Sequence, residues 1–215
     1  MKLSTGFWLI APYATWMVLM AALPATVGGY AVRTVAVAVM LAAGWRQGLK
    51  TLDGRRETCL PSQVSSPLES SVSRLKSSLL PGLAVGFAVF VLWVLPEQFD
   101  LPFYRRFCIV GEGGTQAVAE ASAVMIAIRL IGSAFVISVA EELFFRKWLI
   151  DFAGFWWMVG LFAIEHDRWL VGAICGIAYG ALYLRRGLAA AIVAHATTNL
   201  VLGLWVLKTG QWQFW

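Results

Sequence analysis

Long apolar stretches alternate with short charged clusters along the whole chain. Seven of these stretches, with an expected error of one, approach the length of about 17 to 25 residues that a membrane-spanning helix needs. They cover residues 6–24, 30–44, 79–95, 122–145, 148–164, 169–184 and 188–207. The stretches that contain Arg33 and Asp151 can be tilted, broken or interfacial. The pattern predicts an all-α, polytopic transmembrane bundle, because a backbone can cross a bilayer only when its N–H and C=O groups are hydrogen-bonded to one another, as they are in a helix.

The composition agrees with a membrane protein. Of 215 residues, 60% are hydrophobic and 13% are charged, whereas an ordinary soluble domain has about 25% charged residues. The net charge of +5 does not indicate nucleic-acid binding, because the basic residues lie between apolar stretches instead of forming one polar surface. Residues 45–78 hold six basic and three acidic residues and are predicted to be a cytoplasmic connector. A second polar loop, residues 96–120, is expected on the opposite side.

The chain divides into an N-terminal part, residues 1–121, and a C-terminal core, residues 122–207. The apolar run near the N-terminus is expected to be an uncleaved first span, because a second apolar run follows closely. Cys59, Cys108 and Cys175 are widely spaced and predict neither disulfides nor a thiolate metal site.

Candidate chemistry is concentrated in the C-terminal core, where ionisable residues interrupt apolar spans. Each such group costs about 2.5 to 3.5 kcal/mol at mid-helix, so a function is expected. Glu142 and Arg146 are separated by four residues and can form an ion pair on one helix face. Glu141 points away from that pair, and a desolvated carboxylate without a partner suits a general base. The sequence therefore separates a structural glutamate from a chemical one.

His195 and Asn199 also lie four residues apart and share a helix face, where their N–H groups can stabilise an oxyanion. With Glu141 and His166 they form the set that amide hydrolysis requires. Each motif also has a structural explanation. The Glu-Glu-x-x-x-Arg run can end an interfacial helix, His166 can belong to a solvated turn, and His195 can hydrogen-bond between packed helices.

Three motifs in this order resemble the CPBP intramembrane proteases, which include the type II CAAX prenyl endopeptidases and the bacterial Abi-type proteins. They are EExxxR at Glu141, Glu142 and Arg146, FxxxH at Phe162 and His166, and HxxxN at His195 and Asn199. The run Glu165 to Trp169 is similar to the bacterial CAAX prenyl protease-related branch associated with exosortase systems. The resemblance covers about residues 122–207 and implies a conical active-site cavity within the membrane.

The resemblance implies an endopeptidase that cuts near the C-terminus of a membrane-anchored protein. By this resemblance, Glu141 and His166 of this chain would activate water, and His195 and Asn199 would hold the oxyanion. Glu142, Arg146 and Phe162 would support these four residues. The family is described both as metalloproteases and as metal-free glutamate proteases. No cofactor is expected, because an asparagine suits oxyanion binding, although two histidines and a glutamate are also a possible zinc set.

One geometric problem accompanies this prediction. If Arg146 and the Arg185–Arg186 pair mark the cytoplasmic side, simple counting of spans places His166 on the far side, away from Glu141. The motifs can meet only if the helix before His166 is short, tilted or partly interfacial.

Two other functions stay open at this stage. The first is a non-catalytic membrane immunity or scaffold protein on the same fold. The second is a small transporter that uses buried carboxylates as a proton relay, although no repeated halves are evident. The expected location is the bacterial cytoplasmic membrane, and the expected partners are lipid and a membrane-anchored substrate, without nucleic acid.

Overall fold

The computed structural model describes residues 4–24, 26–47, 67–110 and 122–214, and the regular structure within these residues is entirely helical. In chain order the helices are α1 (Thr5–Ala22), α2 (Val27–Gln47), α3 (Pro67–Gln98), α4 (Pro102–Cys108), α5 (Ala123–Ile131), η4 (Gly132–Ile137), α6 (Ser138–Glu141), η5 (Glu142–Leu149), α7 (Ile150–Ala153), α8 (Phe155–Ile164), α9 (Trp169–Arg186), α10 (Leu188–Thr209) and η6 (Trp212–Phe214). The predicted all-α fold is confirmed.

Five helices of the described residues are long and apolar enough to cross a membrane. They are Thr5–Ala22, Gly28–Gln47, Ser78–Gln98, Ala123–Ala153 and Leu188–Thr209. Helix α9 is also 18 residues long, but Arg185 and Arg186 at its end lower its mean hydropathy. The expected count of about seven spans is not confirmed, and the protein is an integral membrane protein with at least these candidate spans.

The main departure from the predicted spans lies between residues 145 and 164. Helices α5 to α7 form one continuous rod of 31 residues from Ala123 to Ala153, where a break near residue 146 was expected. The break comes at Gly154, whose φ of 93° is in the left-handed region that glycine adopts without strain. Helix α8 then has only ten residues, or about 15 Å at 1.5 Å per residue, which is half of a bilayer core.

The expected polar loops are shorter than their sequence ranges. Helix α3 begins at Pro67, within the connector predicted at 45–78, and α4 forms inside the loop predicted at 96–120. Residues 48–66, including Cys59, lie outside the described residues. Cys108 and Cys175 are buried free thiols, as the cysteine spacing predicted for these two.

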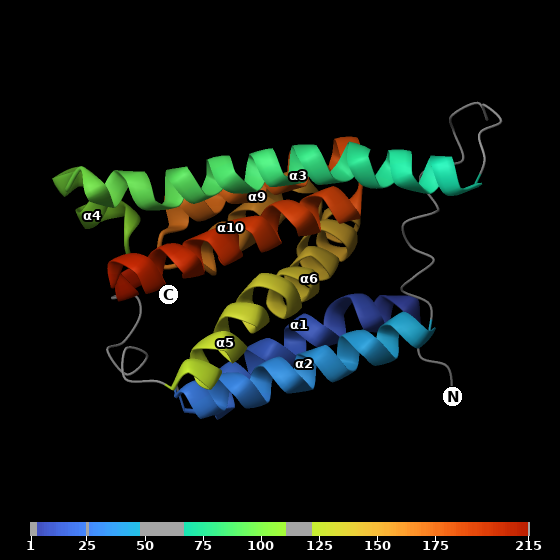
Figure 1. The fold of residues 1–215 in the computed structure, drawn as a ribbon, viewed down its shortest axis with the longest axis horizontal. Helices are drawn as coiled ribbons and strands as arrows, with labels where there is room; N and C mark the ends of the chain where they lie inside the picture. The colour runs from blue at the N-terminus through green and yellow to red at the C-terminus, as the bar shows by residue number, and fades with distance from the viewer. Residues whose placement is uncertain (1–3, 25, 48–66, 111–121, 215) are drawn as a thin grey trace.

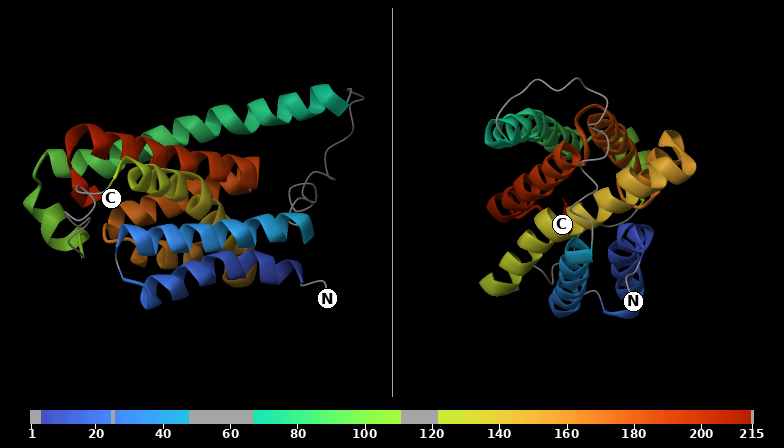
Figure 2. Two further views of the ribbon diagram at one scale, coloured as in Figure 1. Left: turned by 60° about the horizontal axis from the view of Figure 1, so that its bottom comes forward. Right: turned by 90° about the vertical axis from the view of Figure 1, so that its right-hand side faces the viewer.

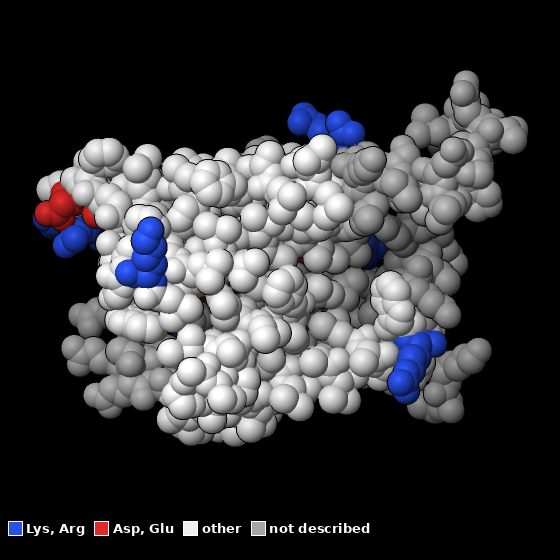
Figure 3. Space-filling view, viewed as in Figure 1, with Lys and Arg blue, Asp and Glu red and all other residues white. Residues whose placement is uncertain are grey.

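The helices pack in three layers (Figure 1). Helices α1 and α2 form one outer layer, α3, α9 and α10 form the other, and the rod of α5 to α7 crosses diagonally between them, as both further views show (Figure 2). Many exposed large apolar side chains, such as Val18, Leu80 and Phe135, face outward. The space-filling view shows a broad surface with few charged groups, most of them near its two ends (Figure 3), as a bilayer requires.

Helices α3 and α10 approach one another closely at two glycines of α3. A Cβ built on Gly86 would lie 2.4 Å from the carbonyl oxygen of Ala194, and one on Gly82 would lie 2.7 Å from Val193. Small residues let helix backbones approach in this way, which is how membrane helices gain packing energy without a hydrophobic driving force. The contact fixes α10, the helix that carries His195 and Asn199.

Gly86→Ala is expected to destabilise the fold, because the added methyl group meets backbone that cannot move aside. Over-packing of this kind costs about 1 to 3 kcal/mol. Gly160→Ala is the matched control, since nothing lies within 4 Å of a Cβ built there. Thermal unfolding of the purified proteins in detergent, followed by tryptophan fluorescence, measures the difference. Equal melting temperatures for the two variants would contradict the close approach.

Candidate active site

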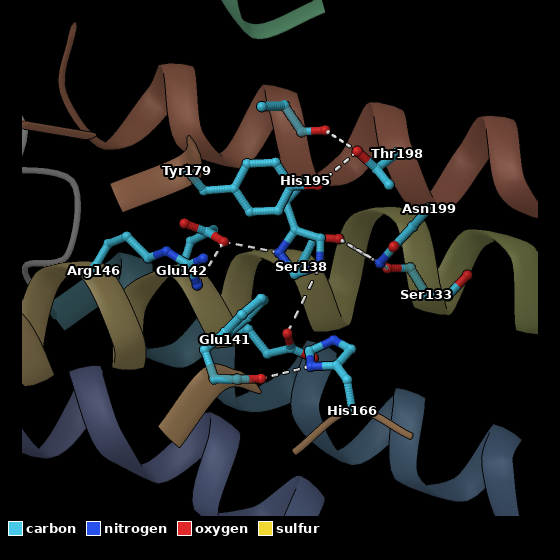
Figure 4. A network of polar contacts seen from close by, with 12 residues as sticks. Ser133, Ser138, Glu141, Glu142, Arg146, His166, Tyr179, His195, Thr198 and Asn199 are labelled. Atoms are coloured by element: carbon cyan, nitrogen blue, oxygen red, sulfur yellow. Dashed lines mark hydrogen bonds and ion pairs between the residues drawn. The ribbon is translucent and has the colours of Figure 1, made fainter. Parts of the chain in front are cut away.

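A chain of charged groups runs through the centre of the bundle (Figure 4). Arg146 Nη1 lies 3.1 Å from Glu142 Oε1, and both side chains are fully buried. The same Glu142 oxygen lies 2.8 Å from Nδ1 of His195. Glu142 of the diagonal rod is therefore shared between a guanidinium of its own helix and an imidazole of α10. The predicted pairing of Glu142 with Arg146 is present. The contact of Glu142 with His195 is an addition that the sequence did not indicate.

Aromatic rings surround the Arg146 guanidinium. Its Cζ lies 4.1 Å from the ring centroid of Phe162 and 5.4 Å from that of Tyr179. Among the described residues its nitrogens find no hydrogen-bond acceptor of good geometry, so ring faces and the Glu142 carboxylate together replace water around this charge. Phe162, named in the FxxxH motif, thus has a physical role beside the ion pair.

Glu141 lies on the other side of His195. Its Oε2 is 3.7 Å from His195 Nε2 and is buried without a hydrogen-bond partner among the described residues. The side chain lines the central cavity. Two adjacent glutamates thus face the two nitrogens of one imidazole, Glu142 at hydrogen-bond distance from Nδ1 and Glu141 further away, at 3.7 Å from Nε2 (Figure 4).

His166 reaches the same cavity from the turn between α8 and α9. Its Nδ1 lies 2.8 Å from the carbonyl oxygen of Phe162, and because a carbonyl only accepts, Nδ1 carries the hydrogen in the neutral ring. The Nε2 atom is then the unprotonated one. The geometric problem posed by span counting is resolved, because the ten-residue α8 brings His166 to the same cavity that Glu141 lines.

Asn199 lies one helical turn after His195 and lines the cavity. As placed, its amide nitrogen donates to the carbonyl oxygen of Ser133 at 3.0 Å and to Oγ of Ser138 at 3.2 Å. Ser133 belongs to the π-helical turn η4, and Ser138 follows it directly, with its hydroxyl donating to the Ser133 carbonyl oxygen at 3.0 Å. Asn199 therefore ties α10 to the diagonal rod, and its role as an oxyanion donor stays a prediction.

The structure adds two residues that the motifs did not reveal. Tyr179 of α9 stacks on the His195 ring, with centroids 5.2 Å apart and planes 22° apart, and its hydroxyl lies 2.6 Å from Thr198 Oγ1. Thr198 in turn lies 2.8 Å from the Gly86 carbonyl oxygen. These contacts fix the plane of the imidazole. Neither residue belongs to a motif, and the one sign in the sequence was that Thr198, three positions after His195, is polar.

Thirteen residues enclose a cavity of about 180 Å³ at this point. The lining residues are Trp93, Ser133, Glu141, Phe162, His166, Cys175, Tyr179, His195, Thr198, Asn199, Leu202, Gly203 and Phe214. All four residues predicted to act together are therefore brought to one space. The volume has room for a few water molecules, at about 30 Å³ each in the liquid. Its conical shape stays an expectation.

A metal ion would need several of these donors to converge. Within the described ranges, no group of three or more His, Cys, Asp or Glu side chains is arranged to hold one. Glu141, His166 and His195 are the residues that could supply ligands, and His195 Nδ1 is already engaged by Glu142.

The fold and the cavity define an integral membrane protein with a buried cluster of carboxylate, imidazole and amide groups inside its helical bundle. Residues 123–201 match the family model described as type II CAAX prenyl endopeptidase Rce1-like. This match contains every motif residue discussed above and confirms the resemblance to the CPBP family for that part of the chain. No curated protein and no solved structure matches the chain. The Rce1-like family is a family of proteases.

Arg146→Met is expected to destabilise the protein by about 3 to 5 kcal/mol, because it leaves the Glu142 carboxylate buried and unpaired. The double variant Arg146→Met with Glu142→Gln should recover part of this loss, since it also removes the buried charge. Lys147→Met, the neighbouring position, is the control. Urea or thermal unfolding in detergent gives the ranking. A double variant less stable than the single one would show that the pair does not dominate.

Proposed function

We propose that this protein is an intramembrane endopeptidase that hydrolyses a peptide bond near the C-terminus of a membrane-associated protein. The observation that carries the proposal is the meeting of Glu141, His166 and His195 at one cavity from three separate segments. A scaffold has no need for this convergence. The Glu141 and His195 atoms lie 3.7 Å apart, within the reach of a single bridging water or a small side-chain movement.

Water activation falls to Glu141 and His166. A water in the cavity would donate one hydrogen to Glu141 and another to the unprotonated Nε2 of His166. As its oxygen attacks the scissile carbonyl carbon, Glu141 takes the proton. The apolar walls around Glu141, among them Phe162, favour this transfer because a desolvated carboxylate holds a proton more readily than one in water.

The tetrahedral oxygen would be held by His195. Its Nδ1 faces the Glu142 carboxylate and carries a hydrogen, so Nε2 can donate only when the ring is an imidazolium. Asn199 joins the oxyanion site when one of its N–H groups leaves Ser133 or Ser138.

Collapse of the intermediate completes the reaction. The C–N bond breaks, Glu141 returns its proton to the departing amine, and the carbonyl re-forms as a carboxylic acid. One water is consumed and no redox partner is required. Glu141 thus acts first as a base and then as an acid, as one carboxylate between two imidazoles can.

The alternative is a non-catalytic immunity or scaffold protein on the same fold. Tyr179 and Glu142 fix the His195 ring by stacking and by a hydrogen bond, and an imidazole oriented from two sides favours the enzyme. A relay transporter gains no support from these contacts. The bacterial cytoplasmic membrane is the proposed location.

Glu141→Gln is expected to lower the rate of peptide cleavage by about 10² to 10⁴-fold, the usual contribution of a general base. Purified protein in proteoliposomes would be mixed with two fluorogenic probes, one a farnesylated peptide with three residues after the modified cysteine, the other an unmodified transmembrane peptide. Asp100→Asn, at an exposed carboxylate, is the matched control.

The outcome decides between enzyme and scaffold. Cleavage by the wild type and by Asp100→Asn, lost in Glu141→Gln and in His195→Ala, supports the mechanism. Equal rates in all four proteins remove the catalytic assignment of both residues. Failure of the folded wild type to cut either probe favours the scaffold.

Metal dependence has its own test. Cleavage should persist after treatment with a chelator such as 1,10-phenanthroline, because the proposed chemistry uses only side chains. Activity that disappears on chelation and returns on addition of Zn²⁺ would overturn the metal-free mechanism and assign Glu141, His166 and His195 as ligands.

A further inference from the structure

The two ends of the bundle differ in charge. At one end, called the basic end, α2 ends, α3 begins, and α9 passes into α10; it lies at the right of Figure 1. The segment between α2 and α3 belongs to residues 45–78, with six basic and three acidic residues, and Arg185 and Arg186 end α9 on the same side. The excess of basic residues marks the cytoplasmic side of a membrane protein.

The opposite end carries the other connections. There α1 passes into α2, α3 passes into α4, and α10 ends (Figure 1). Residues 96–121 hold two basic and four acidic residues. Contacts tie this end together: Glu97 pairs with Arg168, and Trp169 Nε1 donates to the carbonyl oxygen of Phe107 at 2.7 Å. With Arg168 and Lys208, this end carries four basic residues against eight at the basic end, so by the same rule, which counts Lys and Arg, it faces away from the cytoplasm.

The cavity extends from the site toward the opposite end. Of its lining residues on α10, none precedes His195, whereas Leu202 and Gly203 follow it. Gly203 lies eight residues beyond His195, which is about 12 Å further along the helix. Trp93, near the end of α3, and Phe214, after α10, complete that part of the lining.

Between the site and the basic end, tightly buried side chains fill the bundle. Arg146, Ala190 and Ala191 are fully buried, and Phe145 and Tyr183 are 2% exposed. No residue of η5 lines the cavity, although Glu142 and Arg146 are its neighbours. The closed side of the cavity thus faces the basic end, and its lining continues on the other.

We propose that the cavity opens to the extracytoplasmic side, and that its substrate is a membrane-anchored protein whose cleavable segment lies on that side. This inference rests on the proposed peptidase function for the word substrate, but the direction of the opening is independent of it. Phe214 and Leu202, which are 6% and 9% exposed, line the end of the cavity nearest that side, and a peptide would displace them to reach Glu141. A prenylated C-terminus left in the cytoplasm would approach the closed side.

Cysteine labelling tests the direction. In a chain with Cys59→Ser, Cys108→Ala and Cys175→Ala, single cysteines would be placed at Leu202 or Phe214 as cavity reporters. Exposed uncharged positions give the side controls, Gln47→Cys at the basic end and Thr209→Cys at the opposite end. Spheroplasts and inside-out vesicles would be treated with a sulfonated maleimide that does not cross membranes.

The expected pattern is labelling of Thr209→Cys in spheroplasts and of Gln47→Cys in inside-out vesicles. Both cavity reporters should react at least about tenfold faster in spheroplasts, since thiol reactivity follows access. The proposal is overturned if both cavity reporters react faster from the cytoplasmic face or from neither face, or if the two side controls are exchanged. If only one of the two reporter variants folds, the result for the folded variant decides.

This experiment separates two kinds of failure. If no probe peptide is cleaved but the labelling pattern holds, the peptidase function falls and the direction of the cavity stands. If peptides are cleaved and the cavity reporters react only from the cytoplasmic face, the function stands and the extracytoplasmic substrate falls.

Discussion

The buried ion pair of Glu142 and Arg146 is the constraint on which the rest of the site depends. A guanidinium in a bilayer needs a counter-ion and polarisable neighbours, and here it has one carboxylate and the faces of Phe162 and Tyr179. The same carboxylate holds Nδ1 of His195, so the imidazole position follows from the ion pair. Glu141, next in the chain, is thereby left to face the other nitrogen.

Close helix packing makes this network possible. Gly86 brings α3 against α10, and its carbonyl oxygen accepts a hydrogen bond from Thr198, which also contacts the Tyr179 hydroxyl. On another face of α10, the Asn199 side chain donates to the carbonyl oxygen of Ser133 in the π-helical turn η4. The histidine helix is thus held from both sides by backbone atoms, which move less than long side chains.

Much of the site could be predicted from the sequence because its chemistry follows helix periodicity. The four-residue spacings gave the Glu142–Arg146 pair and the shared face of His195 and Asn199. Periodicity could not show that Gly154 ends a rod of 31 residues, because apolar residues continue on both sides of this glycine. It also missed the contribution of Tyr179, which comes from a helix without a motif, and the π-helical turns, which no residue type marks.

The short helix α8 is followed by non-helical backbone at residues 165–168, at the end of the bundle where Glu97 pairs with Arg168. Val110, in the segment after α4, donates its backbone N–H to the Asp167 carbonyl oxygen at 2.7 Å and so satisfies one peptide group of this turn. The turn that carries His166 is therefore held by contacts from outside α8 and α9, a backbone hydrogen bond from Val110 and the ion pair of Arg168 with Glu97.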